Sequence, residues 1–389
     1  MFGIRMKDKV ELSKITYINI ISTTFYKYFH FAFCCQFYST FIRNMKNTLF
    51  LLLFLSPLFN YSQETLNETL VHDGITREYA IHIPPGYDAE SPVPLVFSLH
   101  GFTSNNAFHM LYTGFNNIAD TATFIIVYPQ GTLTAEGASH WNVGGFTAGS
   151  TTDDVGFFDA LIDEVSSNYS INPDRVYSAG MSNGGYMSFL LACQISSKIA
   201  AIASVTGSMT PSTYYECNPE HPTPVLQIHG TTDGTVPYQG GAGWSQSIPN
   251  VLDYWINYNN CETDPIVTPF ADIEPNDGST AERYIWDSGD NGVTTEHIKV
   301  TGGGHDWPGI GLGYGNMDLS ASIEVWKFFM RFDINGSLNA EVNDVVEIDH
   351  EKTLLKIVDI LGRDAREVKN QMLFYIFSDG TTEKRFFTE

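Results

Sequence analysis

The sequence is short of positive charge. Its 389 residues include 21 Lys and Arg against 44 Asp and Glu, which gives a formal net charge of −23 at pH 7. Such a charge argues against nucleic-acid backbones and anionic membrane surfaces as partners. The remaining composition, with 43% hydrophobic and 17% charged residues, is that of a globular protein. The length allows one large α/β domain and a smaller module.

The chain also has little cysteine. Cys34 and Cys35 lie near the N-terminus, and only Cys193, Cys217 and Cys261 follow. Their spacing fits no zinc site, and none has a nearby histidine that would make it a nucleophile. We expect Cys193 and Cys217 to form a disulfide, because that pair closes the shorter loop, and Cys261 to stay free. The sequence also has no P-loop and no dinucleotide fingerprint, so we expect no cofactor and no metal.

The segment that begins at Met45, "MKNTLFLLLFLSPLFNYSQ", has a short basic start, an apolar core over Leu49–Leu55 and a polar exit near Ser62. This pattern predicts a signal peptide over residues 45–62, because the apolar core is too short to span a bilayer. Signal peptides begin at the N-terminus of a protein. We therefore interpret Met45 as the true first residue and residues 1–44 as an extension from a start codon assigned too far upstream. A membrane-bound extension is the alternative. We expect a secreted mature form without a membrane anchor.

From residue 63 to residue 335 the sequence alternates between short apolar runs and amphipathic stretches. The stretch 155–169 has apolar residues at helical spacing, and four apolar runs stop at Gly: "VPLVFSLHG" (93–101), "TFIIVYPQG" (123–131), "DRVYSAG" (174–180) and "PVLQIHG" (224–230). Strands that alternate with helices indicate a mostly parallel sheet covered on both faces, the α/β class. Ligands bind such sheets at the C-terminal ends of the strands.

Residues 336–389 have a different pattern. They contain short β-rich runs, and "SDGTT" is a hairpin turn signal between two of them. We predict a small all-β module over 336–389, joined to the α/β domain near "INGSLNAE", whose Gly, Ser and Asn are typical of a linker.

One serine stands in "GMSNG" (180–184), after an apolar run and before the helical stretch "YMSFLLAC". The pattern G-x-S-x-G between a strand and a helix is typical of a nucleophile elbow, in which the glycines let neighbouring backbones approach the serine. We therefore predict Ser182 as a catalytic nucleophile. The alternative is a helix cap with flanking glycines.

A serine nucleophile needs a base and an orienting acid, which follow in the order Ser, acid, His in this architecture. His305 lies in "TGGGHDWPG", a Gly-rich loop after the run "HIKV", and we predict it as the base. Asp233 follows "VLQIHGTTD", a strand and then a turn, and we predict it as the acid. His100 and His229 each stand in a His-Gly pair, for which we expect strand-end packing.

The oxyanion of the reaction needs backbone N–H donors. We expect one from Asn183, which follows the nucleophile, and one from Phe102 in "LHGFTSN" (99–105). Trp141 and Trp307 lie in loops that could border the cleft, so they are candidate substrate-binding residues, and a structural role is the equal alternative for each. In "DDVGF" (153–157) we expect both acids to cap the following helix rather than to bind a cation.

Seven blocks in order carry a resemblance to a known family: "LHGFTSN", "YPQGT", "WNVGG", "DDVGFFDALID", "NPDRVYSAGMSNGGYMS", "HGTTDGTVPYQGG" and "GGGHDWPG". Over 70–330 the chain resembles secreted polyhydroxybutyrate depolymerases and feruloyl esterases, α/β-hydrolases of carbohydrate esterase family 1. The resemblance implies ester hydrolysis through an acyl-enzyme, with Ser182, Asp233 and His305 as the triad. Family members often carry a cysteine where this chain has "YIWDSGDNG", so a second disulfide through Cys261 is not expected.

The tail, with its blocks "LGR" and "DGTTEKR", resembles the C-terminal sorting domains of the type IX secretion system of Bacteroidetes. The resemblance implies type IX export machinery as a partner and an extracellular or cell-surface location. Together these patterns predict a secreted serine esterase that acts on carboxylic esters, polymeric ones among them. A serine peptidase of the same fold and a non-catalytic polymer-binding protein are the alternatives.

Overall fold

A computed structural model describes residues 64–310, 315–338, 354–359, 372–377 and 382–386. The predicted N-terminal extension (1–44) and signal peptide (45–62) lie outside the described residues. Among the helices described, none combines the length and apolar character that crossing a membrane requires.

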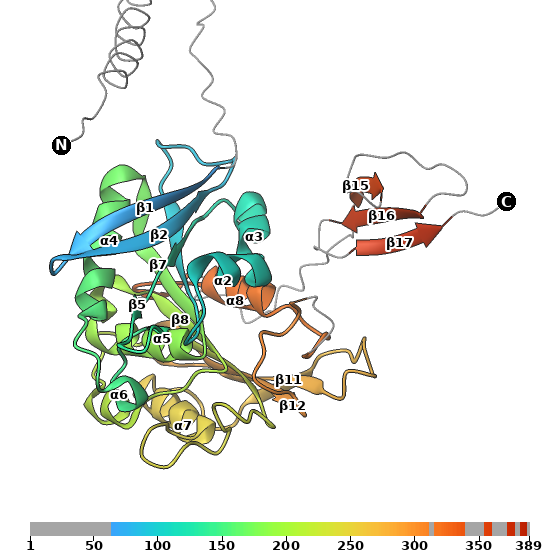
Figure 1. Ribbon diagram of the computed structural model, residues 1–389. Coiled ribbons are helices and arrows are strands. Elements are labelled where there is room, and N and C mark those ends of the chain that lie inside the picture. Colours follow the sequence, from blue (N-terminus) through green and yellow to red (C-terminus); the bar gives the residue numbers. More distant parts are fainter. Residues whose placement is uncertain (1–63, 311–314, 339–353, 360–371, 378–381, 387–389) are drawn as a thin grey trace, which may run out of the picture. The chain divides into compact units, whose positions relative to one another are not determined.

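The described α/β part is built on one ten-stranded sheet with the order β1-β2-β4-β3-β7-β8-β9-β12-β11-β10 (Figure 1). Six neighbouring strands, from β4 to β12 in that order, are parallel, and the strands at both edges are antiparallel. The strands are β1 Glu64–His72, β2 Ile75–Ile83, β3 Val93–Leu99, β4 Ile125–Pro129, β7 Ile171–Met181, β8 Ala201–Val205, β9 Val225–Gly230, β10 Ile266–Pro269, β11 Thr280–Trp286 and β12 Thr295–Thr301.

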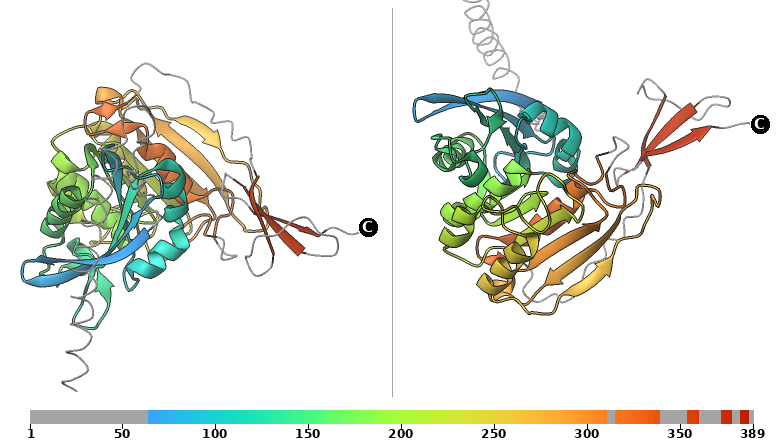
Figure 2. Two further views of the ribbon diagram at one scale, coloured as in Figure 1. Left: turned by 90° about the horizontal axis from the view of Figure 1, so that it is seen from above. Right: turned by 60° about the horizontal axis from the view of Figure 1, so that its bottom comes forward.

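The helices cover both faces of this sheet (Figure 2). One face packs against α4, α5 and α7, and the other against α3 and α8. The helices are α2 Asn106–Thr113, α3 Phe115–Ala122, α4 Asp154–Asn168, α5 Asn183–Gln194, α6 Pro211–Glu216, α7 Ile248–Tyr258 and α8 Ala321–Phe329. The predicted α/β fold, a mostly parallel sheet between two helical layers, is confirmed.

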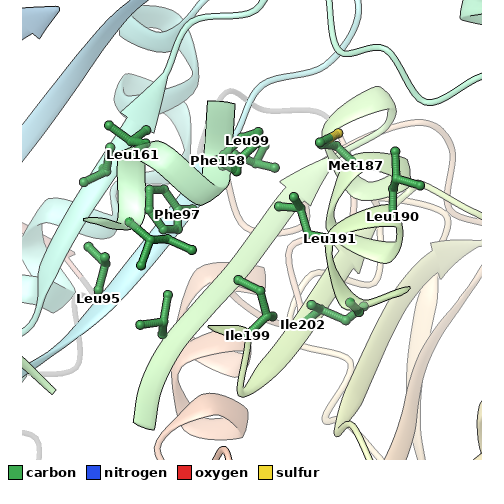
Figure 3. Packing of buried hydrophobic residues seen from close by; sticks show 14 of the residues in the cluster. Leu95, Phe97, Leu99, Phe158, Leu161, Met187, Leu190, Leu191, Ile199 and Ile202 are labelled. Carbon is green, nitrogen blue, oxygen red and sulfur yellow. The ribbon is translucent and has the colours of Figure 1, made fainter. Parts of the chain in front are cut away.

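Alternation along the central strands explains why both faces are apolar. On β3, Leu95 and Phe97 join the core under α4 and α5, whereas Val96 between them joins the core on the opposite face. Figure 3 shows Phe97 close to Phe158 of α4, with Leu191 on the neighbouring α5. Each such buried side chain contributes about 1.5–3 kcal/mol to folding. This packing fixes α5, and therefore the turn that precedes it, against the sheet.

A disulfide joins Cys193, in the last turn of α5, to Cys217, which follows α6. Cys261 is a free and buried cysteine. A Cβ atom on Gly289 would lie 3.0 Å from the Cys261 sulfur. Among the described residues, the chain therefore has a glycine, and no second cysteine, beside Cys261.

The C-terminal segments form a separate antiparallel sheet of the order β15-β16-β17, made of Leu354–Asp359, Met372–Phe377 and Thr382–Phe386. The strands β16 and β17 flank "SDGTT", as the hairpin signal predicts. Another β-rich run of the predicted module, "DVVEID" (344–349), lies outside the described residues. A short hairpin of β13 (Phe332–Asp333) and β14 (Gly336–Ser337) precedes the tail. The predicted domain boundary between 335 and 336 lies between these two short strands and stays a prediction.

Candidate active site

Ser182 stands at the turn between β7 and α5, with φ 53° and ψ −118°. This is a left-handed, strained backbone for a residue with a side chain, which is the conformation of a nucleophile elbow. The glycines on either side permit it. A Cβ atom on Gly184 would lie 2.3 Å from the Leu99 carbonyl oxygen, and one on Gly180 would lie 2.3 Å from the Gly184 carbonyl carbon. The elbow therefore requires glycine at both positions.

Asp233 and His305 lie together at the C-terminal ends of the parallel strands, the edge of the sheet at which Ser182 follows β7. Asp233 follows β9 and His305 follows β12, which pairs in parallel with β9. The His305 Nδ1 atom is 2.8 Å from Asp233 Oδ2, and the imidazole is partly exposed whereas the carboxylate is fully buried. This hydrogen bond leaves Nε2 as the free ring nitrogen for proton transfer.

The buried Asp233 carboxylate is surrounded by donors. Its Oδ1 accepts the N–H groups of Thr235 and Val236, both at 2.8 Å. Burial by itself opposes ionisation, but the hydrogen bond and charge of His305 and the Val236 N–H outweigh it and hold the pKa of Asp233 below its usual value. The acid is therefore ionised throughout the range in which histidines ordinarily titrate.

Two backbone N–H groups beside Ser182 have no acceptor among the described residues. They belong to Phe102, just after the end of β3, and to Asn183, the first residue of α5. The first N–H groups of a helix have no partner within the helix, and the helix dipole favours negative charge there. A Cβ atom on Gly101 would lie 3.4 Å from the Ser182 Cβ, so the Phe102 loop runs next to Ser182.

His100 fixes the peptide that carries the Phe102 N–H. Its Nε2 atom accepts the Gly131 N–H at 2.9 Å, so the ring proton is on Nδ1 and donates to the Gly101 carbonyl at 2.7 Å. Burial is the main cause that lowers the pKa of His100 to about 4, so the ring is neutral at physiological pH. The Gly101 carbonyl and the Phe102 N–H share one planar peptide, and fixing the first orients the second.

The Asn183 side chain links the elbow to the loop that contains Trp141. Its Oδ1 accepts the Trp141 N–H at 2.7 Å and its Nδ2 donates to the Trp141 carbonyl at 3.0 Å. The indole N–H of Trp141 donates to the His100 carbonyl at 2.9 Å. Trp141 is completely buried, so the prediction that it contacts substrate is wrong for this structure, and it joins the strand end to the elbow instead.

Trp307 requires the same correction. It is only 2% exposed, its indole N–H donates to Ser322 Oγ at 3.0 Å, and its ring packs edge-on against Tyr112 and Phe115. The residue follows His305 closely, but its side chain belongs to the core beneath the loop rather than to the surface of the cleft.

The two acids of "DDVGF" have different roles. Asp153 caps α4, as predicted, by accepting the Gly156 N–H at 2.9 Å. Asp154 instead forms a buried ion pair with Arg77 of β2 at 2.7 Å. The prediction of a second cap is therefore wrong, because a cation 77 residues earlier in the chain takes that carboxylate. Across the described segments, no three His, Cys, Asp or Glu side chains gather as a metal site would require.

Sequence reasoning missed the buried polar side chains that surround Asp233. His229 lies 3.4 Å from Asp233 Oδ2, and Gln227 contacts His229. The available signal was the His-Gly pair at the end of β9, which repeats the pair at the end of β3. In both pairs the histidine bonds to a neighbouring loop as well as packing at the strand end.

Comparison with known proteins identifies the family. Residues 77–214 match the family model described as Esterase PHB depolymerase. A probable feruloyl esterase C of Aspergillus terreus is 30% identical over 263 residues, which cover 65% of this chain and 83% of that protein. A bifunctional acetylxylan esterase/xylanase of Neocallimastix patriciarum is 29% identical over 287 residues, 72% of this chain but only 37% of that longer protein.

Among solved structures, an acetyl xylan esterase from Aspergillus awamori has a TM-score of 0.51 at 14% identity, covering 69% of this chain and 99% of that one. This likeness supports the α/β-hydrolase fold. The sequence matches show that the chain belongs to the esterase family of polyhydroxybutyrate depolymerases and feruloyl esterases.

Proposed function

We propose that the chain hydrolyses carboxylic esters with Ser182 as nucleophile, His305 as general base and Asp233 as the orienting acid. The observation that carries the proposal is the 2.8 Å hydrogen bond between His305 and Asp233, two side chains 72 residues apart in the sequence. Both follow parallel strands of the sheet edge at which Ser182 stands on its strained turn.

In the first half of the reaction, Ser182 Oγ forms a bond to the ester carbonyl carbon and its proton passes to His305 Nε2. Asp233 stabilises the resulting imidazolium. The carbonyl oxygen becomes an oxyanion that the N–H groups of Phe102 and Asn183 stabilise. When the carbonyl re-forms, the bond to the alcohol oxygen breaks and His305 returns the proton to the leaving alcohol.

In the second half, His305 takes a proton from water as the water oxygen bonds to the acyl carbon. The second oxyanion forms in the same place, the bond to Ser182 Oγ breaks, and the proton returns to the serine. The acid product leaves and the enzyme is restored.

For the substrate we propose esters carried on plant polysaccharide, with acetyl and feruloyl groups as the candidates. The support is the activity of the two relatives, one a bifunctional acetylxylan esterase/xylanase and the other a probable feruloyl esterase. Phe102 is 42% exposed beside the nucleophile, which favours an apolar or aromatic acyl group. Polyhydroxybutyrate is the third candidate, from the family match.

The test compares the purified protein with a Ser182→Ala variant on acetylated xylan, methyl ferulate, polyhydroxybutyrate and a peptide anilide. The proposal expects turnover of an ester on the first two substrates and none by the variant. Preference for the anilide would indicate a serine peptidase instead. Hydrolysis that survives Ser182→Ala would remove the serine from the mechanism, and absence of hydrolysis with all four would favour a polymer-binding protein.

We further propose export by the type IX route, supported by the signal-peptide pattern over 45–62 and the sorting-domain resemblance over 336–389. Deleting residues 339–389 in a type IX host is expected to leave the esterase inside the cell envelope. Unchanged release into the medium would overturn this part of the proposal.

A further inference from the structure

His229 is a buried histidine that the proposed reaction does not use. It stands on β9 and its side chain is fully buried, yet both ring nitrogens are engaged. Gln227 Nε2 lies 3.0 Å from His229 Nδ1 and also donates to the Gly207 carbonyl at 3.0 Å. An amide nitrogen can only donate, so Nδ1 is the acceptor and the proton of the neutral ring is on Nε2.

The Nε2–H of His229 points into the turn that holds the acid. It donates to the Val236 carbonyl at 2.8 Å and lies 3.4 Å from Asp233 Oδ2. Oδ2 is the oxygen that accepts the hydrogen bond from His305, and Oδ1 already accepts the two turn N–H groups. His229 therefore contacts the acid directly and also fixes the turn whose N–H groups bind the other oxygen.

The remaining contacts connect this turn to the nucleophile side. A Cβ atom on Gly207 would lie 2.8 Å from the Ser182 carbonyl oxygen, so the Gly207 segment packs against the elbow. Gln227 donates to both Gly207 and His229, and it thereby couples the segment under the elbow to the acid turn. Burial lowers the pKa of His229, which keeps the ring in the neutral form that this arrangement needs.

We propose that His229 is a positioning residue that holds Asp233 in register with His305, with Gln227 fixing its tautomer. The inference rests on the proposed triad. Without the Nε2–H, the Val236 carbonyl loses its donor and the Asp233 carboxylate is freer to rotate away from His305. A displacement of about 1 Å of a catalytic group can cost about 100-fold in rate, so a smaller shift of the acid should be measurable in kcat.

The experiment compares His229→Phe, which fills the space without a donor, with His229→Gln, whose amide can still donate to Val236. We expect Phe to lower kcat about tenfold with KM unchanged, and Gln to restore most of the loss. His297→Phe is the matched control. His297 is also buried and bonds through both ring nitrogens, to Gln227 O and Tyr238, but it does not contact Asp233. It should lose stability and retain kcat.

The decisive readout is a double-mutant cycle with Asp233→Asn. If His229 acts through the acid, His229→Phe costs nothing further in the Asp233→Asn background. An equal loss in both backgrounds, or an unchanged kcat in the single variant, would overturn the proposal. Should His229→Phe fail to fold, Gln227→Met serves instead, with a several-fold lower kcat expected and an unchanged kcat contradicting the idea. The Ser182→Ala variant distinguishes failure of the proposed triad from failure of the His229 proposal. If Ser182→Ala retains activity, the triad is wrong, independently of the result at His229.

Discussion

The two turns that carry Ser182 and Asp233 in the candidate active site are held in place by different means. On the nucleophile side, glycines permit the close packing of the backbone. Gly180 and Gly184 let backbone segments approach each other around Ser182 at distances that no Cβ atom allows.

On the side of Asp233 and His305, Gly230 also permits a close backbone contact, because a Cβ atom there would lie 2.3 Å from the Gly303 carbonyl oxygen. The turn that carries Asp233 itself is open. Gly234, next to the acid, has no atom within 4 Å of where a Cβ would lie, and side-chain hydrogen bonds hold the carboxylate.

This difference explains why the turn at Ser182 is easier to predict from the sequence than the hydrogen bonds around Asp233. Close backbone contacts demand glycine at fixed positions, so the elbow has a local pattern. Hydrogen bonds between distant side chains leave no such pattern, because any donor of suitable reach can supply them. The two sides should therefore respond to different substitutions.

The largest expected effect is on the acid side. Asp233→Asn should lower kcat about 10⁴-fold, because the amide no longer stabilises the imidazolium and can favour the wrong histidine tautomer. Steady-state kinetics on a soluble ester at pH 7 would measure it. A loss of less than about tenfold would mean that another group orients His305.

The same carboxylate sets a pH dependence. Since the folded pKa of Asp233 is held below its usual value, its contribution to stability is complete above the unfolded pKa of about 3.9 and is lost as the pH falls through the lower folded value. Unfolding measured between pH 8 and pH 2 should show that the wild type loses its advantage over Asp233→Asn only in the acid part of this range.

The next largest loss of kcat is expected on the nucleophile side, where Gly184→Ala is compared with Gly234→Ala on the acid side. Gly184→Ala should lower kcat by about 10²–10³-fold, the cost of a misplaced oxyanion donor, because its Cβ would lie 2.3 Å from the Leu99 carbonyl oxygen. Gly234→Ala on the acid side should change kcat less than about twofold, since its Cβ meets open space. Equal losses in both variants would break the contrast between the two sides.

A smaller loss is expected at Asn183, whose backbone and side chain serve different purposes. Asn183→Ala keeps the backbone N–H but leaves the buried N–H and carbonyl of Trp141 without partners, at about 1–3 kcal/mol for each group. We expect kcat to fall about tenfold together with a lower melting temperature. Asn168→Ala, at the exposed end of α4, is the control and should change neither.

The smallest expected effect on kcat concerns the disulfide. Cys193 and Cys217, separated by 24 residues, constrain the unfolded chain by about 3 kcal/mol. The Cys193→Ser, Cys217→Ser double variant should unfold at lower denaturant concentration and keep kcat within about twofold at 25 °C, because Ser182 stands at the other end of α5. A large loss of kcat would show that the far end of α5 also positions the nucleophile.

How much of the molecule the sequence predicts follows from how local each signal is. The parallel strands ending at Gly, the helix over 155–169 and the elbow at Ser182 are local patterns, and the structure contains each of them. The burial of Trp141 was not predictable in this way, because a loop tryptophan looks the same in sequence whether it faces solvent or core. Its burial depends on hydrogen bonds to Asn183 and to the His100 carbonyl, which lie 42 residues after it and 41 residues before it in the sequence.

Other contacts could not be predicted for the same reason, because they join residues that are distant in the sequence or leave no local pattern. The pairing of Asp154 with Arg77 joins a helix to a strand 77 residues earlier, and no spacing rule predicts it. The role of His229 depends on Gln227 and on the turn at Val236, which a His-Gly pair alone does not reveal.

The central claim is that Ser182 is the nucleophile of an acyl-transfer reaction. Its most direct test is labelling with a fluorophosphonate probe, followed by mass spectrometry of the intact chain and of its peptides. We predict one adduct per chain, on the peptide that contains Ser182, and none in Ser182→Ala. An unlabelled wild type, or an adduct on another serine with full turnover in the Ser182→Ala variant, would contradict the account.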